Sequence, residues 1–212
     1  MENLVIRKVK ALDGLHYSFG LIDHYYEELY PLCSKINTDN KKVIPTLARC
    51  WGFVDALHRA REISQAIPGL GGKNPHLKSF LKSTVLAKEY RHYIQHLRRE
   101  LNKQPTNTFP VWGVLSWIDE YDETKSHTAW IGARLPGTTY SGHVFDTVNK
   151  KWVSRVSLSI AEKSFNFDPI YEAVQQFEAF VIPWIIEKAG IKIKVTNELP
   201  IISMKAVINK DS

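Results

Sequence analysis

The sequence of 212 residues is poor in cysteine and lacks any long apolar segment. Its longest apolar runs, such as FVIPWII, are far shorter than the roughly 20 residues that cross a bilayer, so we expect no membrane association. The first ten residues, MENLVIRKVK, carry no apolar stretch after their charges, and we expect no secretory signal. Cys33 and Cys50 lack metal-ligand spacing and fall on apolar helix faces, which favours buried thiols over a disulfide. A reducing, cytoplasmic setting fits these absences best.

Common active-site motifs are missing as well. There is no GxSxG elbow and no HExxH helix, and the glycines at 69–72 are not followed by the Lys-Ser/Thr of a phosphate loop. His92 and His96 are one helical turn apart and could offer two imidazoles to a metal, with Glu89 or Glu100 as the nearest acid. A third ligand is not evident, and we expect neither a metal nor another cofactor.

The excess of positive over negative charge is confined to the first half of the chain. Residues 1–105 hold 17 Lys and Arg against 10 Asp and Glu, whereas residues 106–212 hold 11 against 12. The segment 73–103 alone has eight basic residues. A localised basic surface attracts polyanions, of which nucleic acid is the most abundant in a cell. The alternative is a solvated basic helix with no partner.

Apolar residues repeat at helical spacing in two long segments. Between residues 11 and 34 they form a single stripe, made of Leu12, Leu15, Phe19, Ile22, Tyr26, Leu29 and Cys33. We expect Pro31 to kink or shorten the last turn of this helix. A second helix is predicted over about 40–67, because IPGLGG then supplies strong helix breakers.

A third helix is predicted from Asn74, a good capping residue before Pro75, to about Leu101. Its apolar face changes sides midway. The first half would bury Leu77, Phe80, Leu81 and Val85, and the second half Tyr90, Tyr93, Ile94, Leu97 and Leu101. On the side of the helix where the first half is apolar, the second half instead carries Lys88, His92, Gln95, His96 and Arg99. Polar, titratable groups that continue an apolar stripe indicate a cleft or an interface.

After residue 105 the pattern changes to strands. Alternating segments rich in Val, Ile, Thr and aromatic residues predict a four-strand antiparallel meander over 106–162, with a hairpin turn at TVNKKW. The tryptophans beside these strands favour a core role over stacking on RNA bases, and they are Trp112, Trp117, Trp130 and Trp152. A fourth helix is predicted at 168–189, with Asp168 as its cap, and a terminal β-hairpin at 190–208.

These elements predict the α+β class and a single domain over residues 1–212. The three-helix part at 11–104 and the fourth helix would form a four-helix bundle. The β-meander would be inserted between the third and fourth helices.

Arg91 and His96 in RHYIQH are the candidates for chemistry. Five residues apart on one helix, they differ by about 140° in direction and about 7.5 Å in height. Arg91 should therefore lie with Gln95 and Arg98, and His96 with His92 or Arg99. A second copy of the helix would be the simplest way to bring the two together, which favours a site at a dimer interface.

RHYIQH resembles the Arg-x4–6-His motif of the HEPN-domain family, with His92 at the polar position after the arginine. The long helices, with the motif late in a helix before the last one, are similar to HEPN proteins too. The resemblance implies a helical bundle that dimerises around a two-fold axis, and a metal-independent ribonuclease of toxin or phage-defence type. His96 would then be the acid–base group, Arg91 would hold the scissile phosphate, and His92 would support them.

Lys88, Arg98 and Arg99 would guide RNA to such a site, and a cognate inhibitor or antitoxin protein is a candidate partner. One alternative is a non-catalytic interaction module that binds nucleic acid or protein through the basic third helix. Another is that Arg91 only caps a packing contact or pairs with an acid on the first helix, such as Asp23 or Glu27, while His96 is an ordinary surface residue.

Overall fold

Helices make up most of the protein in the computed structural model, which describes residues 2–102, 110–132, 144–161, 163–190 and 201. They are α1 (Glu2–Ile36), the short 3-10 helix η1 (Asn40–Lys42), α2 (Val43–Ala66), α3 (Pro75–Ser83), α4 (Val85–Gln95), α5 (Leu97–Leu101) and α6 (Phe167–Ala189). The strands are β1 (Val114–Ile118), β2 (Ser126–Trp130), β3 (Phe145–Asp146), β4 (Lys151–Trp152), β5 (Val156–Ile160) and β6 (Lys163–Asn166). The chain is therefore of the α+β class, as predicted.

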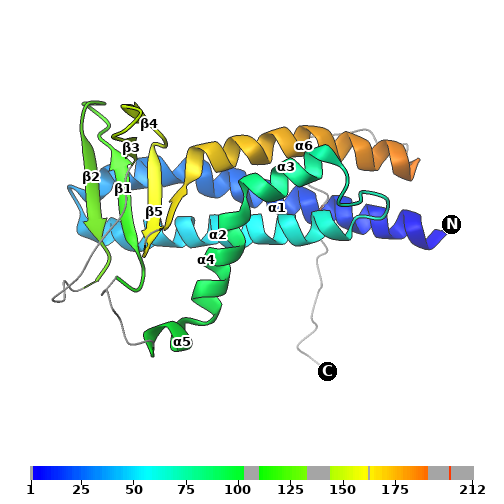
Figure 1. The fold of residues 1–212 in the computed structure, drawn as a ribbon, viewed down its shortest axis with the longest axis horizontal. Helices are drawn as coiled ribbons and strands as arrows, with labels where there is room; N and C mark the ends of the chain where they lie inside the picture. The colour runs from blue at the N-terminus through cyan, green and yellow to red at the C-terminus, as the bar shows by residue number, and fades with distance from the viewer. Residues whose placement is uncertain (1, 103–109, 133–143, 162, 191–200, 202–212) are drawn as a thin grey trace, which may run out of the picture.

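The longest helices, α1, α2 and α6, run side by side along the molecule, and the sheet stands at one end of them (Figure 1). The predicted stripe of α1 faces this body: six of its members are buried and Tyr26 is half-buried. The predicted shortening at Pro31 is wrong, since α1 continues to Ile36. Pro31 has no backbone N–H to donate to the carbonyl of Glu27. Because Glu27 is exposed, water can supply that hydrogen bond instead. Cys33 and Cys50 are buried free thiols, as predicted.

The predicted third helix is instead three helices, α3, α4 and α5. It breaks first at Thr84, where φ is −107° and ψ is 16°, and again at His96. The buried Arg61 of α2 explains the first break: its Nη1 donates to the carbonyl of Leu81 at 2.7 Å and to Oγ1 of Thr84 at 2.5 Å. The Leu81 carbonyl is thereby satisfied outside the helix. The cap by Asn74 and Pro75 is as predicted.

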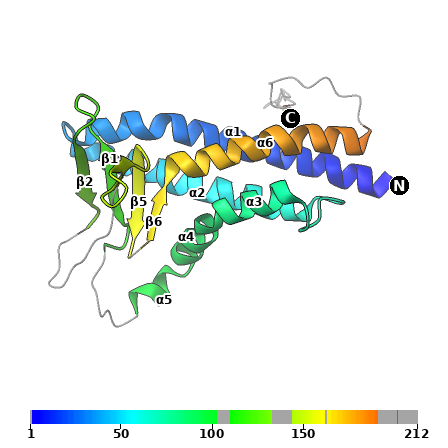
Figure 2. The ribbon, with the colours of Figure 1, turned by 45° about the horizontal axis from the view of Figure 1, so that its top comes forward.

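This break accounts for the change of apolar face. α3 packs on α6, where the rings of Phe80 and Phe177 stack at 4.2 Å, whereas Tyr90 of α4 is buried against β5 and β6. Two residues assigned to these buried faces are exposed instead, Val85 at 45% and Leu101 at 60%. α4 and α5 lead away from the long helices toward the end that carries the sheet (Figure 2).

The four-stranded antiparallel sheet has the order β2-β1-β5-β6, so the predicted meander is wrong. β1 lies between β2 and β5: Leu115 is opposite Ala129 on one side and Leu158 on the other. β1 and β5 are buried at all five positions, which places them in the middle of the sheet rather than at an edge. Trp117 of β1 is buried as predicted, whereas Trp112 before it is 43% exposed.

Between β2 and β5 in the sequence, β3 and β4 form a separate hairpin, in which Phe145 is opposite Trp152. The predicted turn at TVNKKW is thus confirmed. The terminal hairpin predicted at 190–208 lies outside the described residues apart from positions 190 and 201. Gly190 ends α6 in the left-handed conformation, with φ of 63°.

α6 begins two residues earlier than its predicted cap implies. Its cap is Asn166, and Asp168 lies in the first turn. The carboxylate of Asp168 accepts hydrogen bonds from Tyr26 of α1 at 2.8 Å and from the backbone N–H of Arg155 at 2.9 Å. It therefore ties the helical body to the sheet. In the part of the chain that the structure describes, no helix is apolar over a length that would cross a membrane.

Candidate functional site

Arg91 lies on the side of α4 that faces α2. Its Nε donates to Oδ1 of Asp55 at 2.9 Å, and its side chain is 28% exposed. Arg91 thus pairs with an acid, as one alternative predicts, but the acid belongs to the second helix and is neither Asp23 nor Glu27. The side-chain amide of Gln95 is oriented with its oxygen toward Arg91. Nη1 and Nη2 of Arg91 each lie 3.2 Å from this oxygen, so Arg91 contacts Gln95 as the spacing predicts. Asp55 orients the guanidinium through Nε. Nη1 and Nη2, which form the Nη edge of the guanidinium, can donate hydrogen bonds to other acceptors.

Asp55 holds two arginines. Oδ2 accepts from Nε of Arg59 at 2.7 Å, while Oδ1 accepts from Arg91. Partial burial raises the pKa of Asp55, but the hydrogen bonds from both arginines outweigh it and hold the pKa below its usual value. The carboxylate is therefore charged at neutral pH and shared by two cations.

His92 and His96 lie on the outer side of α4. Both are exposed, their ring centroids are 4.3 Å apart, and Nε2 of His92 is 3.2 Å from Nη2 of Arg99. This agrees with the prediction that His96 lies with His92. His96 occupies the break between α4 and α5, with φ of −108° and ψ of 25°. We call His92, His96 and Arg99 the outer cluster.

The remaining basic residues extend the outer cluster along an exposed surface. Lys88 on α4 and Arg98 on α5 are both exposed. Within one protomer the two members of the Arg-x4-His pattern have different neighbours: Arg91 contacts α2, and His96 belongs to the outer cluster.

A cavity of about 720 Å³ opens beside Arg91, across the surface of α1 and α2. We call it the Arg91 cavity. It is lined by Gly14, Tyr17, Ser18, Leu21, Tyr25, Gly52, Asp55, Ala56, His58, Arg59, Glu62, Ile63 and Arg91. Two glycines bring its helices together: a Cβ on Gly52 would lie 2.7 Å from the ring of Tyr25, and one on Gly14 would lie 2.9 Å from Ile63. The cavity combines apolar and aromatic walls with two arginines, two acids and a histidine.

His58 is the histidine of this cavity, and little in the sequence singles it out. Its side chain is 14% exposed, and Nε2 lies 4.0 Å from Oε1 of Glu62. Nδ1 is buried and has no hydrogen-bond partner among the described residues. Burial and then the positive charge of Arg91 lower the pKa of His58, so the imidazole is neutral at pH 7. The only sequence signal was the His58–Glu62 spacing, which is common on helix surfaces.

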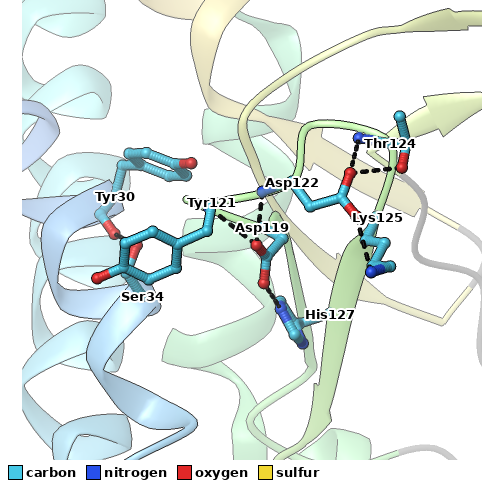
Figure 3. A network of polar contacts seen from close by, with 8 residues as sticks. All are labelled: Tyr30, Ser34, Asp119, Tyr121, Asp122, Thr124, Lys125 and His127. Carbon is cyan, nitrogen blue, oxygen red and sulfur yellow. Dashed lines mark hydrogen bonds and ion pairs between the residues drawn. The ribbon is translucent and has the colours of Figure 1, made fainter.

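A second polar network organises the loop between β1 and β2 (Figure 3). Oδ1 of Asp119 accepts from the backbone N–H groups of Tyr121 and Asp122, and Oδ2 lies 2.5 Å from Nε2 of His127. The hydrogen bond from His127 lowers the pKa of Asp119. Figure 3 shows the loop facing Tyr30 and Ser34 at the end of α1. This network, also absent from the sequence prediction, fixes the shape of the loop between β1 and β2.

Among the residues that the structure describes, no three His, Cys, Asp or Glu side chains gather closely enough to hold a metal ion. Comparisons with protein-family models, with curated proteins and with solved structures each return no match to this chain.

Proposed function

We propose that this protein is a HEPN-like, metal-independent endoribonuclease whose active site is completed when two copies of the chain meet. The observation that carries the proposal is the outer cluster. Two exposed imidazoles lie 4.3 Å apart with a guanidinium 3.2 Å from one of them, on a basic surface that also holds Lys88 and Arg98. Polyanion binding and proton transfer are thereby combined in one place.

The chemistry requires no metal. When the 2′-hydroxyl of RNA attacks the neighbouring phosphate, one group accepts a proton, another donates one, and positive charge stabilises the phosphorane. His96 is the acid–base group, with His92 as its supporting imidazole, and Arg91 holds the phosphate through its Nη edge. Lys88, Arg98 and Arg99 guide the strand toward them. An arginine fork is well suited to a phosphate because it can donate two parallel hydrogen bonds.

Dimerisation follows from the separation of Arg91 and His96 in one protomer. Arg91 contacts Asp55 on the inner side of α4, whereas His96 stands in the outer cluster. A two-fold axis beside α4 would bring Arg91 of one copy to His96 of the other. We propose a HEPN-like layout for the same reason: α1, α2, the α3–α4 pair and α6 supply four helical segments, with the sheet inserted between the third and the fourth.

A ribonuclease of this kind fits a toxin or phage-defence system, in which a cognate inhibitor protein would cover the exposed basic surface. A second candidate function is a non-catalytic module that binds nucleic acid or protein through α4 and α5. The ion pair between Arg91 and Asp55 favours it, because the carboxylate offsets the charge that a scissile phosphate would need.

Cleavage of mixed single-stranded RNA in excess EDTA separates the two functions. We expect the wild type to cleave, and Arg91→Ala and His96→Ala to lose about 100-fold or more of the rate. Arg49→Ala is the matched control. Arg49 is 29% exposed and ion-paired to Glu28, much as Arg91 is 28% exposed and paired to Asp55, but it does not line the Arg91 cavity. Wild-type binding of RNA without cleavage would favour the interaction module instead.

A further inference from the structure

The Arg91 cavity brings together two residues that are 33 positions apart in the sequence, Arg91 and His58. The histidine that shares a cavity with the motif arginine is therefore not the motif histidine. His58 comes from α2 and lies one turn after Asp55, the residue that orients Arg91.

We propose that His58 is a further catalytic residue of this protein, which accepts the 2′-hydroxyl proton of the nucleotide whose phosphate Arg91 holds. The proposal rests on the ribonuclease function proposed above. It assigns the first proton transfer to the inner side of α4 and leaves the second to His96 in the outer cluster.

The geometry gives His58 one usable nitrogen. Nδ1 is buried, so Nε2, which lies 4.0 Å from Glu62, is the atom that can exchange a proton with a ligand in the cavity. Arg91 is held from behind by Asp55 at 2.9 Å, and its Nη edge lies 3.2 Å from the Gln95 amide oxygen. A phosphate oxygen can take the place of that amide oxygen without disturbing the ion pair.

The cavity has the size and the walls for part of an RNA strand. Its volume of about 720 Å³ falls within the usual range for small-molecule sites, about 300–1,000 Å³. Tyr17 and Leu21 of α1, which line it, are 40% and 42% exposed. They offer an aromatic and apolar surface for the ribose and base.

The protonation state of His58 suits a proton acceptor. Burial and Arg91 lower its pKa, so the imidazole is neutral at pH 7. The charged and titratable groups around it are Asp55, Arg59, Arg61 and Glu62 on α2, Arg91 on α4, and Tyr17 and Tyr25 on α1. His58 supplies the imidazole among the residues that line this cavity, and imidazole is the side chain most often used for general acid–base catalysis.

The step balances without any further reactant. The 2′-oxygen gives its proton to Nε2 of His58 and forms a bond to phosphorus, and the bond from phosphorus to the 5′-oxygen breaks. That oxygen takes a proton from the imidazolium of His96, supplied by the second copy of the chain. The products are a 2′,3′-cyclic phosphate and a free 5′-hydroxyl, and nothing is oxidised or reduced.

The test compares His58→Gln with His24→Gln in the EDTA cleavage assay. His24 forms the same kind of pair one helical turn from a glutamate, 3.8 Å from Glu28, but it lies on α1 outside the Arg91 cavity and is 53% exposed. We expect His58→Gln to lose about 100-fold or more of kcat/KM and His24→Gln to keep wild-type activity. The acidic limb of the pH profile, which the proton acceptor sets, should disappear from the activity that His58→Gln retains.

A second variant, His58→Ala, distinguishes loss of the imidazole from loss of the fold. His58→Ala leaves room for a free imidazole, and added imidazole should restore part of the rate, with thermal unfolding showing that the variant is folded. A folded His58→Ala that imidazole does not rescue would overturn the assignment.

The failures of the two proposals are distinguishable. A wild type that cleaves, with His58→Gln within threefold of it and Arg91→Ala inactive, would overturn the role of His58 and leave the ribonuclease proposal standing. A wild type that cleaves no RNA between pH 5 and pH 9 would overturn both.

Discussion

The inner and outer sides of α4 differ in almost every physical respect, although they belong to the same three turns. On the inner side, Tyr90 is buried, and its hydroxyl shares one proton between the carbonyl oxygens of Leu158 and Lys163, which lie 2.8 and 2.7 Å away. Arg91 is fixed by Asp55. On the outer side, His92 and His96 are exposed, and the centroids of their rings are 4.3 Å apart.

This difference separates two tasks. The inner side holds α4 on the body and sets the direction of Arg91, whereas the outer side presents groups whose position contributes little to folding. Substitutions on the inner side should therefore change stability, and those on the outer side should change RNA binding and cleavage alone.

The largest effect is expected at Tyr90. Tyr90→Ala removes a buried ring and the hydroxyl proton that two strand carbonyls share, which should lower the free energy of unfolding by about 3–5 kcal/mol. His92→Ala, two residues along on the outer side, should stay within about 0.5 kcal/mol of the wild type. Urea unfolding measures both. Equal losses in the two variants would contradict the separation.

Arg61 should have the next largest effect, because it fixes the start of α4. Arg61→Met keeps the length of the side chain but removes the donor to the Leu81 carbonyl and to Thr84, and we expect a loss of about 1–3 kcal/mol. Arg59→Met is a suitable control, since Arg59 is 62% exposed on the same helix. The comparison uses thermal unfolding, with RNA cleavage of the folded variant measured beside it. Unchanged stability in Arg61→Met would mean that the break at Thr84 does not need this contact.

A smaller effect, limited to RNA, is expected on the outer side. Arg99→Gln removes one exposed cation, so the slope of log affinity against log salt concentration should fall by about 0.7, while thermal stability stays unchanged. Binding of uncleavable single-stranded RNA at several salt concentrations gives the slope. An unaltered slope would show that Arg99 does not contact the RNA backbone.

The smallest effect concerns pH and Asp55. Its pKa is lowered in the folded state, so its contribution to stability is present above the unfolded value near about 4 and is lost as the pH falls through the folded value. Because the side chain is 41% exposed, Asp55→Asn should cost less than about 1 kcal/mol at pH 7. The wild type should lose more stability than Asp55→Asn between pH 5 and pH 2. Parallel acid-unfolding curves would show that the ion pair contributes nothing.

Patterns within single helices were predictable from the sequence. The stripe of α1 from Leu12 to Cys33 is a local signal, and it reports burial correctly because a long helix packs along one side. The cap at Asn74 and the neighbours of Arg91 and His96 on α4 are local in the same sense.

Features that depend on distant residues were missed. The change of apolar face near Thr84 was visible, but its cause, Arg61, lies more than 20 positions earlier and leaves no local trace. The strands were found but not their order, because the pairing of β1 with β5 joins segments some 40 residues apart. Asp55 and His58 became candidates only when α2 and α4 were seen together, since the contact of Arg91 with Asp55 spans 36 positions.

The central claim is that two copies of the chain build one site, and mixing two inactive variants tests it most directly. Arg91→Ala and His96→Ala are unfolded together, refolded and assayed on RNA in EDTA. In a site shared across a two-fold axis, half of the dimers combine both variants and one of their two sites is intact, so about a quarter of the wild-type activity should return. A mixture as inactive as each variant alone, with dimers confirmed by solution mass, would contradict the shared site.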